Sequence, residues 1–292
     1  MSAAVIVLVI ISAFMHSGWN LLARRQRSEM AFFARMLLIV VLVGFLPAAI
    51  SEGLTRSLPA KAWFCLVGSG FCAGLYLYSL AKAYGASDFT IVYPVARALP
   101  VLLVAFGDLV RGRFLNGPGW VGLVLVAVGC LLTPLDSFRE ISLRRYFHHS
   151  ILWMLLAAIG TVGYSLLDKV ASEVVLAGPA TAARYCYIFF FFASVVLLVL
   201  RWITNNKPTK DKTIGWKGPA LGAICFFGAY WLVLWAYQLS RHASYVVAFR
   251  QFSIVIGVVA AFLIYKERRV LVRIVGIALI MVGLILVGIY GS

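Results

Sequence analysis

Two arginine residues lie deep inside apolar stretches of the sequence, Arg97 about eight residues into one stretch and Arg250 near the middle of another. A guanidinium group at bilayer depth is costly and normally serves a substrate or ion pathway. Its planar fork of donors suits carboxylate, phosphate or phosphonate groups. We therefore interpret the pair as an anion-binding centre. The alternative is that these side chains satisfy carbonyl groups of broken helices or pair with an aspartate near a helix end.

Polar and proline residues accompany both arginines. Tyr93 precedes Arg97 by four positions and shares its helical face, and Pro94 lies between them. Proline in a membrane helix frees backbone carbonyl groups, which must then be satisfied near a cavity. Gln251 follows Arg250 directly and adds both donor and acceptor groups. Tyr93 and Gln251 are therefore candidate substrate-binding residues beside the arginines.

A second group of polar residues lies near the N-terminus. His16, Trp19 and Asn20 follow i, i+3, i+4 spacing and share one face of a helix that is otherwise apolar. Such a face should turn away from lipid, toward substrate or toward a neighbouring helix. Histidine changes charge near neutral pH, so His16 is the candidate proton carrier. A helix-packing hydrogen bond is the alternative role of His16.

Aromatic residues at inward spacing form a third group of candidate substrate-binding residues: Tyr76, Tyr164, Tyr230, Trp231 and Trp235. Trp231 and Trp235 are one helical turn apart and can stack against an apolar group or a cation. A place in the aromatic belt at the membrane surface is the alternative for these tryptophans.

The elements that carry these residues are membrane helices. Hydrophobic residues make up 63% of the 292 residues and charged residues 12%, against about 25% charged residues in soluble domains. Lipid must therefore solvate most of the chain, and no room remains for an aqueous domain. We expect an all-α integral membrane fold with ten spans: 3–22, 30–50, 62–82, 89–110, 118–135, 150–168, 180–202, 217–239, 243–265 and 270–290.

The basic residues predict the orientation of these spans. Connections after odd-numbered spans, counted with the span ends beside them, hold 16 of the 26 lysines and arginines, and connections after even-numbered spans hold 6. We expect the protein in the inner cell membrane. The positive-inside rule then places the odd connections on the cytoplasmic side and both termini on the other side. The net charge of +16 is thus explained by membrane anchoring, and nucleic acid is not an expected partner.

Several kinds of chemistry are not expected. The five cysteines are scattered singly and form no metal-type spacing with histidine, so neither a metal nor another cofactor is predicted. No HExxH, GxSxG or paired deep carboxylates occur in the sequence, and we expect no enzyme. Asp108 and Asp168 fall near expected span ends, so no carboxylate is expected at the depth of the arginines. The N-terminal stretch lacks a basic n-region and is read as a retained helix.

The sequence contains an internal repeat. Residues 18–24 align with 163–169 at an offset of 145, and Gly122 aligns with Gly276 at an offset of 154. The second register sets Arg97 opposite Gln251, one place from Arg250. We expect two repeats of five helices, residues 1–135 and 150–292, joined by a basic cytoplasmic linker over 136–149. Five is odd, so the repeats must be inverted, which is the arrangement of secondary transporters.

The chain resembles the ten-helix, EamA-like members of the drug/metabolite transporter superfamily. The resemblance rests on residues 16–20, the pairs Ala34-Arg35 and Ala183-Arg184, and Tyr93-Pro94 with Arg97. Lys266-Glu267 departs from the glycine–glutamate pattern of the family, and so does Arg113. The resemblance covers essentially the whole chain and implies transport of a small metabolite.

The leading hypothesis is a secondary transporter that moves an anionic or zwitterionic metabolite by alternating access: an amino acid, a phosphonate or a phosphorylated compound. A lipid or isoprenoid-phosphate flippase and a broad-specificity drug or metabolite exporter on the same scaffold are the alternatives. The expected partners are a small-molecule substrate and membrane lipids. The oligomeric state is left open, with a monomer as a plausible form.

Overall fold

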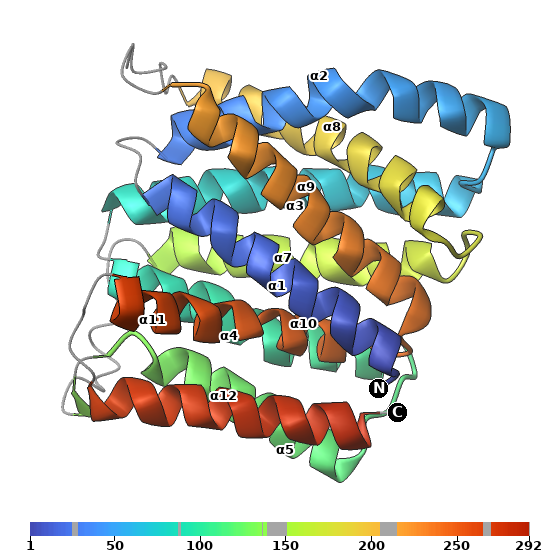
Figure 1. Ribbon diagram of the computed structural model, residues 1–292. Coiled ribbons are helices and arrows are strands. Elements are labelled where there is room, and N and C mark those ends of the chain that lie inside the picture. The colour runs from blue at the N-terminus through green and yellow to red at the C-terminus, as the bar shows by residue number, and fades with distance from the viewer. Residues whose placement is uncertain are drawn as a thin grey trace.

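The computed structural model describes residues 1–24, 29–86, 89–135, 137–138, 151–204, 215–264 and 270–291, and regular structure within them is entirely helical. This confirms the expected all-α fold (Figure 1). The helices are α1 (Ala3–Arg24), α2 (Glu29–Thr55), α3 (Ala60–Ala86), α4 (Phe89–Val110), α5 (Gly117–Leu132), α7 (Ile151–Ser172), α8 (Pro179–Ile203), α9 (Lys217–Leu239), α10 (Ala243–Arg250), α11 (Phe252–Ile264) and α12 (Leu271–Tyr290).

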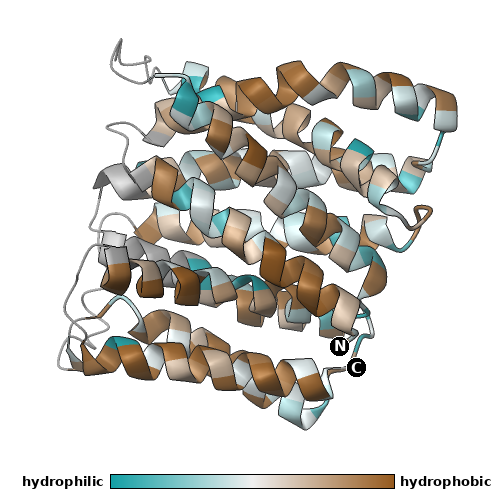
Figure 2. Cartoon of the chain, viewed as in Figure 1, coloured by the Kyte–Doolittle hydropathy of each residue, from teal (hydrophilic) through white to brown (hydrophobic). Residues whose placement is uncertain are grey.

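Lipid contact explains the composition of these helices. In a bilayer each backbone polar group needs an internal partner, and a helix supplies one along nearly its whole length. Eight segments of the described residues are long and apolar enough to span a membrane, with α10 and part of α11 counted together. Apolar side chains such as Leu42 and Leu46 are exposed on outward faces of the helices. Figure 2 shows brown, hydrophobic residues along much of every helix.

The two halves of the chain pack as inverted copies. α3 of the first half packs against α7, and α1 packs against α9 in the corresponding position. Likewise α2 pairs with α8, and α5 pairs with α12. When the two halves are interchanged, the α3–α7 contact becomes the α9–α1 contact, and the α2–α8 and α5–α12 contacts are unchanged. The two halves are therefore related by a pseudo-two-fold axis, as the odd number of helices in each half requires.

Glycines related by the internal repeat contact each other where α5 crosses α12. A Cβ atom added to Gly129 would lie 2.6 Å from the carbonyl oxygen of Gly276, and one added to Gly122 would lie 2.8 Å from that of Gly283. Both Gly122 with Gly276 and Gly129 with Gly283 are related by the offset of 154. The contacts therefore exchange repeat-related residues across the axis. Only glycine allows the two backbones to approach this closely.

Both termini lie on one face of the molecule, which we call the terminal face (Figure 1). The ammonium group of Met1 donates a hydrogen bond of 2.9 Å to the carbonyl oxygen of Gly288 near the end of α12. The ends of α2, α4, α7 and α9 lie on this face too, because the helices alternate in direction. We call the other side the opposite face. An even number of spans explains why the two termini share a side.

The ninth span differs from the expected single helix. It is divided into α10 and α11 at Gln251, which lies in a turn inside the membrane-spanning region. The backbone N–H of Gln251 donates to Ala248 at 2.9 Å, so the first helix ends in a tightened turn. α2 and α7 also continue several residues beyond the expected ends. Of the predicted linker 136–149, only residues 137–138 are among the described residues.

Candidate functional site

A central cavity lies between the two halves and contains both deep arginines. It encloses about 450 Å³ of open space between its walls. The lining residues come from five helices and from the turn at Gln251, and they include most of the expected polar groups. They are His16, Asn20, Tyr76, Leu80, Arg97, Pro100, Thr161, Tyr164, Val247, Arg250 and Gln251. Both halves contribute, as expected for a site on the pseudo-two-fold axis.

Arg97 reaches across the cavity from the first half to the second. Its guanidinium Nη2 donates a hydrogen bond of 2.8 Å to the hydroxyl oxygen of Ser253 in the first turn of α11. The hydroxyl group of Ser17 in α1 donates to the carbonyl oxygen of Ser253 at 2.9 Å. Ser253 is therefore the point where α1, α4 and α11 meet, and it orients the guanidinium group of Arg97.

Arg250 is the last residue of α10, where a positive charge complements the carbonyl end of the helix dipole. Its guanidinium carbon lies 5.9 Å from the ring centre of Tyr164 and 5.6 Å from that of Tyr230. These are cation–π distances, and the rings flank the charge. The two aromatic rings hold Arg250 in the wall of the cavity.

Gln251 occupies the turn between α10 and α11. Its side-chain Nε2 donates to the carbonyl oxygen of Val247 at 3.0 Å, which satisfies a group freed by the break in the helix. Its buried Oε1 lacks a hydrogen-bond partner among the residues that the structure describes. A buried unsatisfied acceptor is costly, so a solute or a water molecule with a donor group suits this position.

The polar face of α1 lies where the spacing predicted. The indole Nε1 of Trp19 donates to Nδ1 of His16 at 3.3 Å, and the side-chain amide of Asn20 donates to the carbonyl oxygen of His16 at 2.8 Å. When the ring of His16 is neutral, this arrangement assigns its proton to Nε2. The contact with Trp19 lies within α1 and joins no second helix, and His16 lines the cavity.

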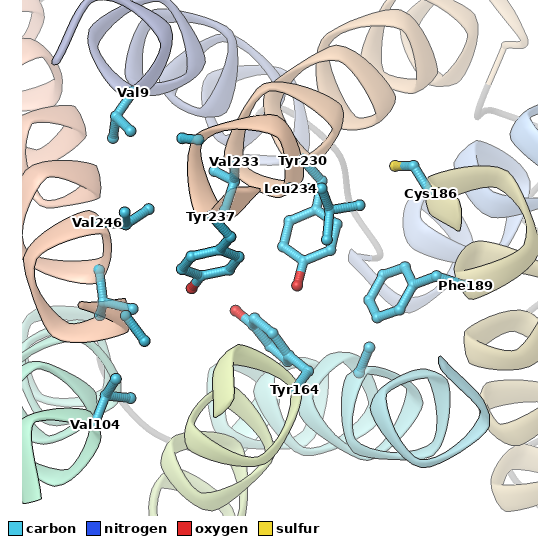
Figure 3. Packing of buried hydrophobic residues seen from close by; sticks show 14 of the residues in the cluster. Val9, Val104, Tyr164, Cys186, Phe189, Tyr230, Val233, Leu234, Tyr237 and Val246 are labelled. Carbon is cyan, nitrogen blue, oxygen red and sulfur yellow. The ribbon is translucent and has the colours of Figure 1, made fainter. Parts of the chain in front are cut away.

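An aromatic extension adjoins the polar cavity and encloses about 460 Å³ of open space. The two share His16, Tyr76, Tyr164 and Arg250. The extension is otherwise mostly apolar and is lined by Ser12, Trp19, Ala73, Leu77, Phe189, Phe190, Phe226, Ala229 and Tyr230. Figure 3 shows the ring of Tyr164 facing those of Tyr230 and Tyr237, with Phe189 beside Tyr230. The site therefore has a cationic polar part and an aromatic part.

Three of the expected site residues are not placed in this cavity. Trp231 follows Tyr230, and successive side chains on a helix point about 100° apart. The ring of Trp231 consequently lies outside the cavity, where its Nε1 donates to the carbonyl oxygen of Pro179 at 2.8 Å. Trp235 stacks on Trp231 at 6.4 Å. The backbone of Tyr93 belongs to α4, but its side chain lies outside the described residues.

Asp168 was missed as a site residue. It lies near the end of α7, as expected, but it is buried with 1% exposure. One carboxylate oxygen accepts a hydrogen bond of 2.7 Å from the hydroxyl group of Tyr185, and the other accepts one from the hydroxyl group of Tyr230. Because Tyr230 lines the cavity, a buried carboxylate lies directly behind the cavity wall.

Ion pairs join the two halves at the terminal face. Arg184 at the start of α8 lies 3.3 Å from a carboxylate oxygen of Glu52 near the end of α2, and it also donates to Ser57 at 2.9 Å. Both partners are largely buried. Arg184 therefore joins α8 to the end of α2. Its counterpart Arg35 lies 5.1 Å from the ring of Trp216, a contact typical of the interface.

A second ion-pair network connects α4 with α7. Glu173 accepts a bond of 2.7 Å from Arg111 and lies 3.3 Å from the ammonium group of Lys169. Burial alone would raise the pKa of Glu173, but the hydrogen bond from Arg111 and the charge of Lys169 outweigh it and hold the pKa below its usual value. Asp108 extends the network by capping α10, because it accepts bonds from the backbone of Ala243 and Ser244. These contacts join elements of the two halves at the terminal face.

Comparison with known proteins agrees with this architecture. The profile of the EamA-like transporter family matches residues 3–134 and 148–289. A Sinorhizobium protein named as an uncharacterized transporter in the cobO 3' region is 28% identical over 106 residues, which are 36% of this chain and 75% of that protein. A solved crystal structure at 15% identity covers 99% of this chain and 98% of its own with a TM-score of 0.69, which shows the shared fold.

The described residues contain eight helical segments that could span a membrane, and a cavity lies between the two halves of the chain. Together with the family profile, this architecture identifies a membrane transporter of the drug/metabolite transporter superfamily. With the family profile matching most of its length, the chain belongs to the EamA-like transporter family. The resemblance inferred from the sequence is thereby confirmed.

Proposed function

We propose that this protein is a secondary transporter that carries a small anionic or zwitterionic metabolite by alternating access. The observation that carries the proposal is the convergence of Arg97 and Arg250, one from each half, on a single cavity inside the membrane. Among the described residues, none of the ion pairs involves Arg250. A solute carboxylate, phosphonate or phosphate can therefore bind to its guanidinium group.

Two further observations indicate which groups the solute carries besides its negative charge: the unpartnered Oε1 of Gln251 and the aromatic extension. A donor such as an ammonium or hydroxyl group would satisfy Gln251, and an apolar portion would occupy the space beside Phe189 and Phe226. Amino acids and aminophosphonates have this combination of groups.

Alternating access would require the terminal face to open. The Glu52–Arg184 pair and the network around Glu173 join opposite halves there, whereas the cavity extends from mid-membrane toward the opposite face. The distribution of basic residues supports a cytoplasmic opposite face in the inner cell membrane. The cavity of this conformation would then face the cytoplasm.

A ligand screen tests the proposal. Thermal unfolding of the purified protein is measured with L-glutamate, L-phenylalanine, aminoethylphosphonate, glucose phosphate and a quaternary ammonium salt. We expect anionic or zwitterionic members of the panel to raise the unfolding temperature. Arg97→Ala or Arg250→Ala should weaken binding of the stabilising compound by about 10- to 100-fold, the loss of one or two charge-assisted hydrogen bonds.

Arg241→Ala serves as the matched control, because Arg241 is exposed in the connection between α9 and α10. Stabilisation by the quaternary ammonium salt alone, or full response of both cavity variants to anions, would contradict an anion site. Orientation is tested separately with Ser2→Cys, labelled by a membrane-impermeant maleimide from either side of the membrane. The wild type with its five native cysteines provides the background.

A further inference from the structure

Asp168 lies between two separate spaces inside the protein. On one side is Tyr230, whose ring lines the aromatic part of the central cavity. On the other side, Asp168 itself lines a smaller pocket of about 220 Å³ at the terminal ends of α7, α8 and α9. Tyr185, Ser172 and Gln238 line this pocket as well. The carboxylate is therefore shared between the substrate cavity and a polar recess near the terminal face.

The hydrogen bonds of Asp168 connect these two spaces in series. The hydroxyl group of Tyr230 bonds to one oxygen from the cavity side, and that of Tyr185 bonds to the other oxygen at 2.7 Å from the recess side. With both tyrosines as donors, the arrangement suits an ionised carboxylate. A proton on the oxygen that faces Tyr230 reverses this bond, because the hydroxyl oxygen of Tyr230 then accepts it. Protonation thus changes the cavity wall at Tyr230.

Arg250 is coupled to the same position. Its guanidinium carbon lies 5.6 Å from the ring centre of Tyr230. The hydroxyl group of the same tyrosine donates a hydrogen bond to the carboxylate of Asp168. One tyrosine therefore separates the buried negative charge from the cation that faces the solute. An ionised Asp168 offsets part of the positive charge of Arg250, and a protonated Asp168 leaves that charge to the solute.

The other charged and titratable groups around Asp168 do not replace it. α3 contributes the thiols of Cys65 and Cys72, α8 that of Cys186, and α9 the phenol of Tyr237. Thiols and phenols ordinarily release their protons well above neutral pH. Of the charged residues of α4, Arg97 faces the central cavity and Asp108 pairs with Arg111, which in turn bonds to Glu173. Lys169 donates to the carbonyl oxygen of Tyr237 and turns away from its neighbour in sequence.

We propose that Asp168 is the proton-binding site of the transporter and that a proton and the anionic solute bind together. This inference rests on the proposed transport function and deepens it. A proton from water in the terminal-face recess binds to the carboxylate of Asp168, whose charge changes from minus one to zero, and it leaves again after the protein has changed its access. His16, the candidate proton carrier chosen from the sequence, lines the same cavity as Arg97 and Arg250. The positive charges of these two arginines oppose the addition of a proton to the His16 ring.

Infrared spectroscopy tests the site without any solute. The C=O stretching band of a protonated carboxylic acid is followed in reconstituted wild-type protein between pH 4 and pH 9. We expect a band that disappears as the pH rises and that is absent in Asp168→Asn. Tyr230→Phe and Tyr185→Phe keep the acid and remove one donor each, so they should move the band to higher frequency. If Asp168→Asn fails to fold, these two variants still test whether the band belongs to Asp168.

Asp211→Asn is the control, because Asp211 belongs to the connection between α8 and α9. It should leave the band unchanged. A carboxyl band that persists in Asp168→Asn, or no titrating band in the wild type, overturns the assignment of the proton to Asp168. Neither result depends on whether a solute binds.

Coupling is tested with a carboxylate compound that stabilises the protein in the ligand screen. Its own charge is constant between pH 5 and pH 8, so a change in affinity reports on the protein. We expect the wild type to bind it more tightly as the pH falls, by up to about tenfold for each pH unit, the limit for one linked proton. Asp168→Asn should bind it with an affinity that no longer depends on pH.

A pH-independent affinity in the wild type, or weaker binding at low pH, overturns joint binding of proton and solute. Failure of every compound in the panel to bind contradicts the proposed function instead, and the infrared result on Asp168 then stands by itself. The two inferences are thus separable by experiment.

Discussion

Arg97 and Ser253 form a hydrogen bond of 2.8 Å that joins the first half of the chain to the second inside the membrane. The two residues are 156 positions apart in the sequence. Ser253 is buried, and its hydroxyl group has a charged donor as partner. The bond is therefore expected to influence both stability and the position of the guanidinium group.

Removal of this bond should be measurable. We expect Ser253→Ala to lower the free energy of unfolding by about 1–3 kcal/mol, the contribution of a hydrogen bond to a charged group. Denaturant unfolding in detergent, followed by tryptophan fluorescence, measures the change. Ser194→Ala is the control, because Ser194 bonds only to Phe190 of its own helix. Equal effects of the two substitutions would contradict a special role of Ser253.

The guanidinium geometry of Arg250 should matter beyond its charge. Lysine keeps the positive charge but loses the planar fork and its stacking between Tyr164 and Tyr230. We expect Arg250→Lys to weaken binding of a carboxylate solute by about tenfold, less than Arg250→Ala. Isothermal titration calorimetry with the compound found by the ligand screen gives the comparison. Unchanged affinity in Arg250→Lys would mean that charge alone suffices.

The ion pair between Glu52 and Arg184 should be worth more than a surface pair, because both partners are largely buried. Arg184→Gln leaves the carboxylate of Glu52 without its charged partner, and we expect a loss of about 3–5 kcal/mol of unfolding free energy. The double substitution Glu52→Gln with Arg184→Gln should cost less than the sum of the single changes. Additive effects in the double-mutant cycle would show that the pair is not coupled.

Stability should depend on pH through Glu173. Its pKa is lower in the folded protein than in the unfolded chain, so its stabilising contribution is complete above the unfolded pKa of about 4.3 and is lost as the pH falls through the folded value. Glu173→Gln should lower the unfolding temperature at pH 7 and have little effect at the most acidic pH. Thermal unfolding between pH 3 and pH 7 measures this difference. An effect that does not change with pH would contradict the ion-pair network.

The crossing of α5 and α12 should tolerate no side chain. A Cβ atom at Gly129 would lie 2.6 Å from a backbone oxygen, which cannot move aside as a flexible side chain can. We expect Gly129→Ala to destabilise the protein by about 1–3 kcal/mol. Gly257→Ala is the matched control in a membrane helix, because nothing lies within 4 Å of the added atom. Similar unfolding temperatures for the two variants would contradict close backbone contact.

Sequence reasoning located the helices and much of the polar cavity. Apolar length predicts a span directly, and the cost of a charge at bilayer depth made Arg97 and Arg250 conspicuous. The i, i+3, i+4 face of α1 placed His16 and Asn20 correctly at the cavity for the same physical reason. Their role in binding a solute stays a prediction.

Other features needed three-dimensional information. Trp231 and Tyr230 are neighbours in an almost uniformly apolar helix, so no sequence periodicity distinguishes the ring that faces the cavity from the one that faces outward. The turn at Gln251 has no proline or glycine beside it to indicate a break. Asp168 looked like a residue at a helix end, because its burial depends on tyrosines from two other helices.

The contact between Met1 and the carbonyl oxygen of Gly288 brings the beginning and the end of the polypeptide together. A short peptide could join them, and the chain could then be opened between its halves instead. The second half would be synthesised first, and every helix would still find the same neighbours. For this protein, the order in which the two halves are translated is therefore separable from the architecture they form.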